Sequence, residues 1–422
     1  MTFFRSGAGL IPEFPSPHEN TDILDVATEE AGVQPPFGQA LHVTPLVAEG
    51  ELVARGAAVA CLRNAPDICL VAPIPGRVAR ISLLPGRKLS EIILFREENG
   101  GIARHAIAAS TTGAELRRLM QTAGFWPRLR RRPFGGMPKG DEVPAAIFVM
   151  GVDTRPYAPD PQQALEGREA SFERGLAALY SVTDGPVFVC WPDGSKVPGV
   201  QTKEGDLRWI TCGPRHPQGS AGIRIHQAFP AGLDATVWDI HAEDVADLGE
   251  LLDTGALPVT RLLRIAGAGL REGLSVRTHP GADLRQLTRR IAAPGPHVLM
   301  SGSHLDGRPA RWLGHRHRQV TVLPRDEARP RPHWLIAALT ETAATRPVIP
   351  TAALNQSLGA VLHATPFIRA LGAGDDELAM DLGLLSLLEE DVALADYALG
   401  ADGGIMQQVR AMLDRIRVEY AP

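Results

Sequence analysis

The sequence of 422 residues predicts a mixed α/β protein with several domains. Its first quarter alternates short β-branched runs with Gly or Pro turns, which is typical of hairpin-rich β structure. Its middle alternates continuous apolar runs with helical periodicity, which indicates a parallel sheet with crossover helices. In its last quarter, apolar residues recur mainly at helical spacing.

The N-terminal part is expected to form an irregular arm over residues 1–33 and a β module over residues 34–100. The turn rhythm of the module resembles the barrel-sandwich hybrid of lipoyl and biotinyl carrier domains. Such carriers need a lysine at an exposed hairpin tip. The matching tip, Asn-Ala-Pro-Asp at 64–67, has none, so we expect a structural module.

A Rossmann-like α/β domain is expected over residues 101–257. Apolar runs at 145–153 and 186–191 predict buried parallel strands. Helical periodicity at 160–180 predicts the crossover between them, and a further helix is expected at 112–131.

Two more regions complete the predicted architecture. Residues 258–330 are rich in β-branched residues and predict a β-grasp (SLBB-like) module. Residues 331–422 predict a helical C-terminal domain. Its last helix is expected to bury one face, made of Ile405, Val409, Met412, Leu413 and Ile416.

Bulk composition excludes several function classes. The 43 Lys and Arg against 48 Asp and Glu give a net charge of −5, which argues against nucleic-acid binding. The four cysteines lack metal-ligand spacing and predict reduced thiols. The sequence shows no signal-peptide pattern and no apolar run long enough to span a bilayer, so work at a membrane would need other subunits.

The stretch TVWDIHAEDVADLGELLDTGAL, residues 236–257, holds six acids and no Lys or Arg. Its apolar residues recur at helical spacing, the acids of the first turn suit the helix dipole, and Gly255 stands where a left-handed cap is needed. We expect the acids to form a solvated helix face. An ion-binding or partner-binding surface is the alternative.

This stretch also resembles a signature of the A subunit family of the sodium-translocating NADH:quinone reductase. Other blocks agree in order: RRRPFGGMPKGDEVPAAIFVMGVDTRPYAPDP at 130–161, GPRHPQGSAGIRIH at 213–226, SGSHLDGR with LGHRHRQVTVL, and LLEEDVALADY. The resemblance spans about residues 34–420.

The resemblance implies a peripheral subunit on the cytoplasmic side of the bacterial inner membrane. The complex of this family passes electrons from NADH to ubiquinone and exports sodium ions. The A subunit would scaffold the membrane-embedded B subunit next to the quinone site, without catalysing a step itself. FMN, FAD and a 2Fe–2S cluster are expected in partner subunits, with no tightly bound cofactor or metal in this chain.

A nucleotide or flavin site has no support in the sequence. Related flavoproteins use a glycine-rich loop to approach phosphate, whereas the matching AGFWPRLRRRPFGGMP is bulky and basic. Trp126 and Pro127 stand where backbone would have to approach the phosphate. The histidines at 304, 315 and 317 have no carboxylate or Cys to complete a zinc site.

Two segments supply the candidate site residues. The glycines of the 213–226 loop would let a ligand approach, so the quinone-edge candidates are His216, Gly219, Gly222 and His226. A tight turn with a buried histidine is the alternative. The subunit-interface candidates are Arg128, Arg130, Arg131, Arg132, Pro133, Phe134, Glu243 and Asp244. For the arginines, a solvated face or a set of salt bridges to neighbouring acids is the alternative.

The last third departs from the family pattern. Leu354-Asn355-Gln356-Ser357 runs directly into LGAVLHATPFIRALGAGDD, so the long Met-Val-Pro-Ile-Gly and Tyr-Glu-Arg stretch of the family is missing. The family's Cys-Pro-Gly-Lys segment is replaced by GADGGIMQQ. These departures keep a second hypothesis open: a non-catalytic interaction protein, or a subunit of a different Rnf-like or Nqr-like redox complex.

Overall fold

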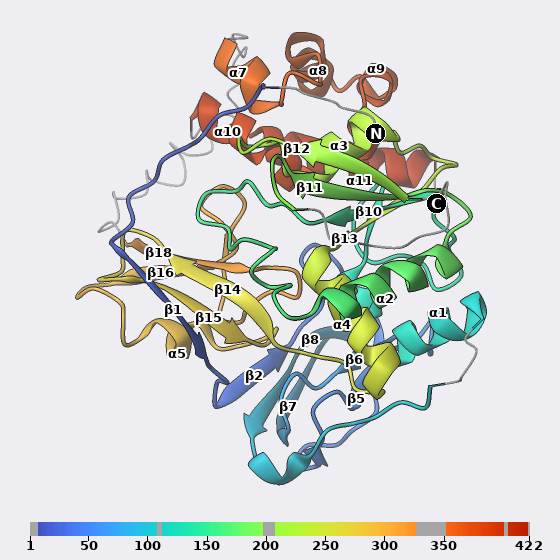
Figure 1. Cartoon of the computed structure of the whole chain (residues 1–422), viewed down its shortest axis with the longest axis vertical. Coiled ribbons are helices and arrows are strands. Elements are labelled where there is room, and N and C mark those ends of the chain that lie inside the picture. Colours follow the sequence, from blue (N-terminus) through green and yellow to red (C-terminus); the bar gives the residue numbers. More distant parts are fainter. Residues whose placement is uncertain (1–6, 108–111, 197–206, 326–351, 401–403, 421–422) are drawn as a thin grey trace.

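The computed structural model describes residues 7–107, 112–196, 207–325, 352–400 and 404–420. These residues form a mixed α/β structure with four sheets, several helices between them and a helical cap (Figure 1). The predicted mixed α/β class is confirmed, whereas the domain boundaries stay predictions. None of the described helices is both long and apolar enough to cross a membrane.

The N-terminal β module contains two small sheets, with strand orders β2-β8-β7-β4 and β3-β5-β6. Val43, Val59, Leu70, Val78 and Ile92 from both sheets share one buried core. The elements are β2 (Glu30–Val33), β3 (Val43–Pro45), β4 (Leu52–Val53), β5 (Ala58–Leu62), β6 (Cys69–Val71), β7 (Gly76–Leu84), β8 (Lys88–Arg96) and the 3-10 turn η1 (Glu98–Gly100).

The central sheet has the strand order β12-β11-β10-β13-β9, and its first four strands are parallel. Strand β10 pairs with β11 on one side and β13 on the other, so the chain order reverses between β10 and β13. The elements are α1 (Gly113–Thr122), η2 (Trp126–Arg128), β9 (Arg130–Arg132), β10 (Ala146–Met150), α2 (Glu169–Leu179), η3 (Tyr180–Val182), β11 (Val187–Pro192), β12 (Leu207–Cys212), α3 (Ala221–Ala228), β13 (Val237–His241) and α4 (Ala242–Thr254).

Strand alternation explains how helices cover both faces of this sheet. Ile147 and Val149 of β10 pack in the core that holds α2 and α4. Phe148 points to the opposite face and packs with Ile225 of α3. Helices α2 and α4 touch through backbone, since a Cβ on Gly175 would lie 1.9 Å from the Val245 carbonyl oxygen.

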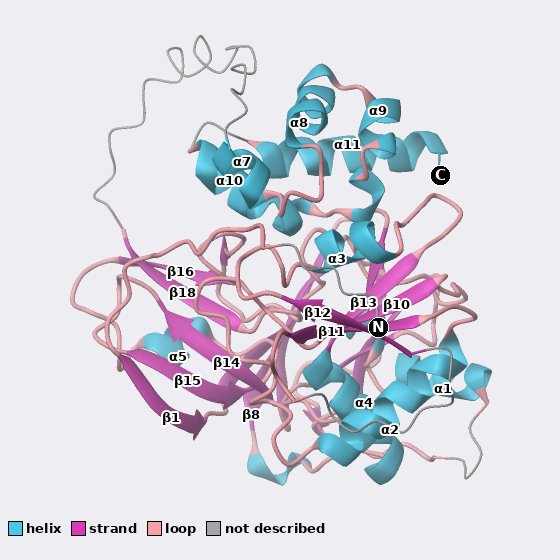
Figure 2. Cartoon of the chain, turned by 45° about the horizontal axis from the view of Figure 1, so that its top comes forward, coloured by secondary structure: helices cyan, strands magenta, loops and turns pink. Residues whose placement is uncertain are grey.

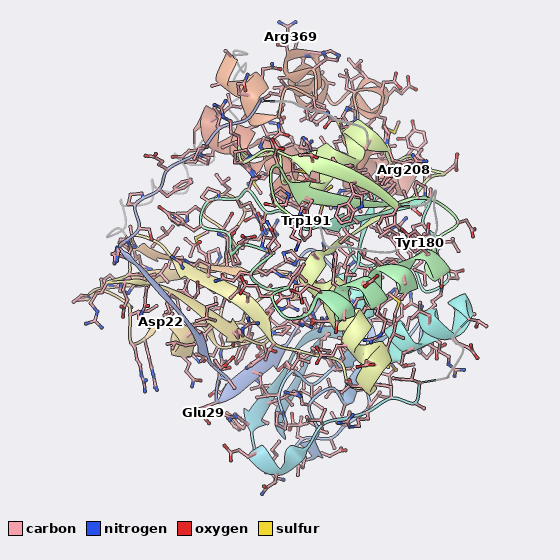
Figure 3. All side chains as sticks on the ribbon, viewed as in Figure 1. Asp22, Glu29, Tyr180, Trp191, Arg208 and Arg369 are labelled. Atoms are coloured by element: carbon pink, nitrogen blue, oxygen red, sulfur yellow. The ribbon has the colours of Figure 1, made fainter. Side chains whose placement is uncertain are left out.

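The third region is a six-stranded sheet with the order β1-β15-β14-β18-β16-β17. The expectation of an irregular arm over residues 1–33 was wrong for two segments, because β2 lies within it and it supplies the edge strand β1 of this sheet. Strand β1 pairs in parallel with β15, and Asp22 lies on it at the margin of the molecule (Figure 3). The elements are β1 (Glu19–Asp25), β14 (Arg261–Ala266), β15 (Gly273–Thr278), α5 (Leu284–Thr288), β16 (His297–Ser301), β17 (Arg308–Pro309) and β18 (Gln319–Pro324).

This sheet and the β module meet at Trp312. The indole of Trp312 packs on Gly32 of β2, where an added Cβ would lie 2.5 Å from the ring. Its Nε1 donates to Glu91 Oε2 at 2.9 Å. The contact therefore needs glycine at position 32.

The C-terminal helices cap one end of the molecule (Figure 2). They are α7 (Ala352–Ser357), α8 (Ala364–Ala373), α9 (Asp376–Asp381), η4 (Leu384–Ser386), η5 (Glu389–Val392), α10 (Ala393–Leu399) and α11 (Ile405–Tyr420). The predicted face of the last helix is confirmed, because all five of its apolar residues are buried. The predicted helical content of residues 331–351 lies outside the described residues.

Two helix predictions were too long. The helix expected at 112–131 ends at Thr122, because Gly124 adopts φ +76° and Pro127 follows. The helix expected at 160–180 begins only at Glu169, after turns that end with Gly167 at φ +73°. In both segments, apolar residues at helical spacing continue across a glycine turn that the helix does not include.

Candidate functional site

A cavity of ≈ 180 Å³ lies at the carboxyl ends of β10 and β13, where the strand order reverses. Ligands of open parallel sheets bind at such a reversal. Its walls come from the loop after β10, the N-terminus of α3, the loops of the six-stranded sheet and η5. Six arginines line it: Arg130, Arg132, Arg155, Arg308, Arg316 and Arg318.

One group of ion pairs that lines the cavity surrounds Asp239 of β13. Arg132 of the neighbouring strand β9 pairs with Asp239 and, at 3.0 Å, with Asp391. Arg316 reaches Asp239 at 2.5 Å. Burial opposes the charge of Asp239, but the adjacent arginines, Arg132 foremost, hold its pKa below the ordinary range. The pairs join β9, β13, the 315–318 segment and η5.

The acids of α4 form a second buried group, so the expected solvated face was wrong for the first two turns. Glu243, Asp244 and Asp247 are at most 3% exposed. Arg318 lies 3.0 Å from Glu243 and 2.8 Å from Asp244, and Arg128 contacts both aspartates. Only the C-terminal end of the helix is exposed to solvent, and 59% of the Asp253 side chain is accessible there.

The burial of these acids shifts their pKa values, which the sequence could not show. Burial raises the pKa of Glu243, whereas Arg318 and Arg128 outweigh burial and lower the pKa of Asp244 far below its usual range. The salt-bridge alternative for the basic run thus holds for Arg128 and Arg132. It also holds for Arg131, which lies 3.1 Å from Glu142.

A third ion-pair group also lines the cavity. Arg155, in the loop after β10, lies 2.5 Å from Asp153 and 3.0 Å from Asp306 of the 301–307 loop. Arg155 lowers the pKa of Asp306 against the effect of its burial. The pair connects the central sheet to the six-stranded sheet.

The 3-10 turn η5 supplies three acids to the same cavity. Glu390 pairs with Arg130, and Glu389 lies 2.5 Å from Arg410 of α11. Asp391 Oδ1 accepts a hydrogen bond of 2.9 Å from the Gly222 N–H at the N-terminus of α3. A carboxylate of the chain itself therefore occupies the place where such helix ends bind anions.

The four quinone-edge candidates lie in and behind the wall of the cavity. Gly219 lines the cavity and donates from its N–H to Thr154 Oγ1 at 2.9 Å. His216 lies behind it, 1% exposed, with Nδ1 3.1 Å from the same Oγ1. Burial lowers the pKa of His216 to about 4, so it is neutral at neutral pH.

Gly222 and His226 have other surroundings. A Cβ on Gly222 would lie 2.3 Å from Asp391 Oδ2, so the close approach here is made by an internal carboxylate. His226 packs on Gly383, before η4, and does not line the cavity. The structure thus brings His216, Gly219 and Gly222 together and places His226 apart from the cavity.

The interface candidates are mostly buried within the chain. Arg132, Glu243 and Asp244 are at most 3% exposed, and Phe134 packs in the core of the C-terminal helices. Arg130 is more exposed, at 23% of its side chain. Their assignment to a subunit interface stays a prediction.

The sequence reasoning missed several residues of the cavity. Asp153 and Arg155 follow directly on the predicted strand at 145–153, and carboxyl ends of parallel strands are where ligands bind, so this signal was present. Asp306 and Asp391 lie in the blocks SGSHLDGR and LLEEDVALADY that carry the family resemblance, but nothing in the sequence indicated that these distant segments meet at one cavity. Within the described chain, no three His, Cys, Asp or Glu residues are arranged to hold a metal ion.

Comparisons with known proteins identify the family. A family model described as the NqrA second alpha/beta domain matches residues 111–257. The A subunit of the Na(+)-translocating NADH-quinone reductase of Saccharophagus degradans is 32% identical over 379 residues, covering 82% of this chain and 84% of that protein. The chain belongs to the NqrA family, the A subunits of the Na(+)-translocating NADH-quinone reductase.

Other members of the family agree over greater lengths. The NqrA protein of Pasteurella multocida is 30% identical over 429 residues, covering 94% of both chains. Among solved structures, an NAD+-reducing [NiFe]-hydrogenase in the air-oxidized state aligns over 71% of this chain and 63% of its own. With 10% identity and a TM-score of 0.36, that likeness carries no argument.

Proposed function

We propose that this chain is the peripheral NqrA component of a Na(+)-translocating NADH:quinone reductase, bound to membrane subunits and chiefly to the B subunit. Family membership over most of the chain is the observation that carries the proposal. The chain would lie on the cytoplasmic side of the bacterial inner membrane, and it would scaffold the quinone-side subunit of the complex.

The chain is proposed to be non-catalytic on its own, with FMN, FAD and the 2Fe–2S cluster held by partner subunits. The carboxylate of Asp391 on the Gly222 N–H supports this, because it would repel a nucleotide phosphate there. Trp126 is 0% exposed, and its Nε1 donates to the Pro138 carbonyl oxygen. Its bulky side chain thus stands in the segment where related flavoproteins use glycines to let the backbone approach a phosphate.

We also propose that the three sheet regions have the folds that the sequence predicts. The two small sheets would be a barrel-sandwich hybrid, the central sheet a Rossmann-like layer and the six-stranded sheet a β-grasp (SLBB-like) module. The strand order of the central sheet, with its reversal between β10 and β13, supports the second assignment.

The 213–226 loop is proposed to border the ubiquinone. Its glycine Gly219 lines the cavity, and the neutral His216 behind it has a buried Nε2 that finds no hydrogen-bond partner among the described residues. A neutral imidazole N–H can donate to a quinone carbonyl. The departures of the C-terminal region favour a second candidate, a subunit of a different Rnf-like or Nqr-like redox complex.

The experiment is complementation of a deletion strain, with NADH-dependent quinone reduction measured in its membranes. The intact gene should restore sodium-stimulated activity. His216→Gln should raise the KM for quinone with little change in the amount of assembled complex, whereas His18→Gln, on the exposed arm, should behave as wild type. Full activity without the chain would refute the proposal, and an unchanged KM would refute the role of the loop.

A further inference from the structure

Two free cysteines of the N-terminal β module are direct partners across a hairpin. Cys61 lies on β5 and Cys69 on β6, and the antiparallel register of the two strands places one opposite the other. In the next pair along the hairpin, the Leu62 N–H donates to the Ile68 carbonyl oxygen at 3.0 Å. Because hydrogen-bonded and non-hydrogen-bonded pairs alternate in an antiparallel ladder, Cys61 and Cys69 form a non-hydrogen-bonded pair.

This pairing has the geometry that a disulfide needs. The Cα atoms of a non-hydrogen-bonded pair are about 4.5 Å apart, and disulfides join Cα atoms that are roughly 4.4–6.8 Å apart. Opposed residues also point their Cβ atoms to the same face of the sheet. A bond between the two sulfur atoms therefore requires little movement of the backbone.

The two thiols lie on the outer face of the three-stranded sheet. Their chain neighbours Ala60 and Leu70 belong to the core, so strand alternation turns the cysteines away from it. The row continues on β3 with the exposed Thr44, whose carbonyl oxygen accepts a hydrogen bond of 3.9 Å from Cys61 Sγ. Cys61 is 9% exposed and Cys69 8% exposed, which suits a small, uncharged oxidant.

We propose that Cys61 and Cys69 are a site of reversible oxidation, at which hydrogen peroxide joins the two sulfur atoms in a disulfide. The thiolate is the nucleophilic form of cysteine. Burial, Cys61 and Asp67 raise the pKa of Cys69 to about 11, so Cys69 is a poor first nucleophile and the first attack is assigned to Cys61.

The reaction balances over two steps. The Cys61 thiolate attacks one oxygen of the peroxide, the O–O bond breaks, and the departing hydroxide takes up the proton that the Cys61 thiol had lost. Cys61 is then a sulfenic acid, which condenses with a thiol. The Cys69 sulfur attacks the Cys61 sulfur, the S–O bond breaks, and the hydroxide leaves as water with the Cys69 proton. Each sulfur loses one electron overall, and one peroxide becomes two waters.

The hairpin that the disulfide would link supports the segment between α1 and the cavity. Strands β5 and β6 lie next to α1, and Asp67 at the hairpin tip is 3.9 Å from Arg118 of this helix (Figure 1). Val71 of β6 packs on Gly124, where an added Cβ would lie 2.5 Å from Val71 Cγ1. A disulfide restricts the unfolded chain, so oxidation should raise the temperature at which the chain unfolds.

The other two cysteines provide an internal comparison. In the register of β11 and β12, Cys190 is the partner of Ile210 and Cys212 is the partner of Pro192, so the two cysteines are not opposed. They are 0% and 1% exposed and lie in a hydrophobic cluster. Hydrogen peroxide should therefore spare both.

The test treats the folded full chain with hydrogen peroxide, blocks the remaining thiols and digests the protein with trypsin without a reducing agent. Cleavage after the arginines at 55, 63 and 77 leaves Cys61 in the peptide 56–63 and Cys69 in the peptide 64–77. Mass spectrometry should find these two peptides joined, with the loss of two hydrogens, and dithiothreitol should separate them. The oxidised chain should unfold about 3 °C above the reduced chain.

Cys61→Ser and Cys69→Ser should each abolish the joined peptides and the shift in unfolding temperature, whereas Cys212→Ser should keep both. Separate peptides in the peroxide-treated wild type, or a disulfide through Cys190 or Cys212 in their place, would overturn the site. An oxidised chain that unfolds at a lower temperature than the reduced chain would overturn the fit of the disulfide to this strand register.

Discussion

At the scale of single residues, the ionic side chains determine how the site is built. Asp239, Asp244 and Asp391 are buried, and each contacts arginines or backbone N–H groups from a different part of the chain. Removal of one member of a buried pair leaves the other charge uncompensated, which is more destabilising than loss of an exposed pair.

Asp244→Ala should lower the free energy of unfolding by about 3–5 kcal/mol, because Arg128 and Arg318 would each lose one of their two buried counter-ions. Urea denaturation followed by circular dichroism measures this. Asp253→Ala on the same helix is the matched control, since its partner Arg174 is 3.3 Å away and both side chains are exposed, and it should change stability by about 1 kcal/mol or less. Equal effects of the two substitutions would contradict the buried network.

A second residue-scale prediction concerns acid stability. Burial lowers the pKa of His279 to about 4, and the residue is 2% exposed with Nε2 3.3 Å from the Thr28 N–H. Because the unfolded chain binds the proton first, stability is complete above pH 6.5 and falls as the pH drops toward 4. The loss is about 3 kcal/mol for such a shift.

Denaturation at a series of pH values checks this prediction. In His279→Gln, the free energy of unfolding should fall less steeply between pH 6.5 and 4, because about one proton fewer is bound on unfolding. If the wild type and the variant lose stability in parallel over this range, His279 is not a buried neutral histidine.

At the scale of elements, the sequence was informative wherever a local pattern decides the structure. The strands at 146–150 and 187–192 and the helix ending at the left-handed Gly255 follow from apolar runs and cap chemistry. The burial of the acids on α4 could not be predicted, because their partners Arg128 and Arg318 lie more than 70 residues away. Local spacing describes a helix but not what packs on it.

Contact between elements gives a third prediction. Gly32→Ala should destabilise the chain by about 1–3 kcal/mol, because the added methyl would overlap the Trp312 ring that joins β2 to the six-stranded sheet. Gly372→Ala in α8 is the matched control. No atom of the described residues lies within 4 Å of its added methyl, so it should be neutral or stabilise by about 0.5–1 kcal/mol.

The thermal unfolding temperatures of both variants test this prediction. A Gly32→Ala protein that unfolds at the wild-type temperature would show that the contact between Trp312 and Gly32 does not hold the two sheets together. The intrinsic fluorescence of the tryptophans should change with Gly32→Ala and not with Gly372→Ala.

At the scale of the whole molecule, the cavity is where the separate parts meet. Ion pairs from the loop after β10, α4, the six-stranded sheet and η5 all converge there. The sequence predicted the buried strands of the central sheet, but the loop expected at 213–226 ends at Ser220, just before α3 begins, and the convergence could not be predicted. Many of these pairs join residues distant in sequence, such as Arg132 and Asp391, which are 259 positions apart.

Affinity purification of the tagged chain from gently solubilised native membranes, followed by mass spectrometry, tests the central claim most directly. We predict recovery of the membrane-embedded B subunit and the remaining subunits of the Na(+)-translocating NADH:quinone reductase in constant ratio. Recovery of a different set of redox subunits would support the Rnf-like or Nqr-like alternative and contradict the sodium pump. Recovery of the chain alone, in the soluble fraction, would contradict any role in such a complex.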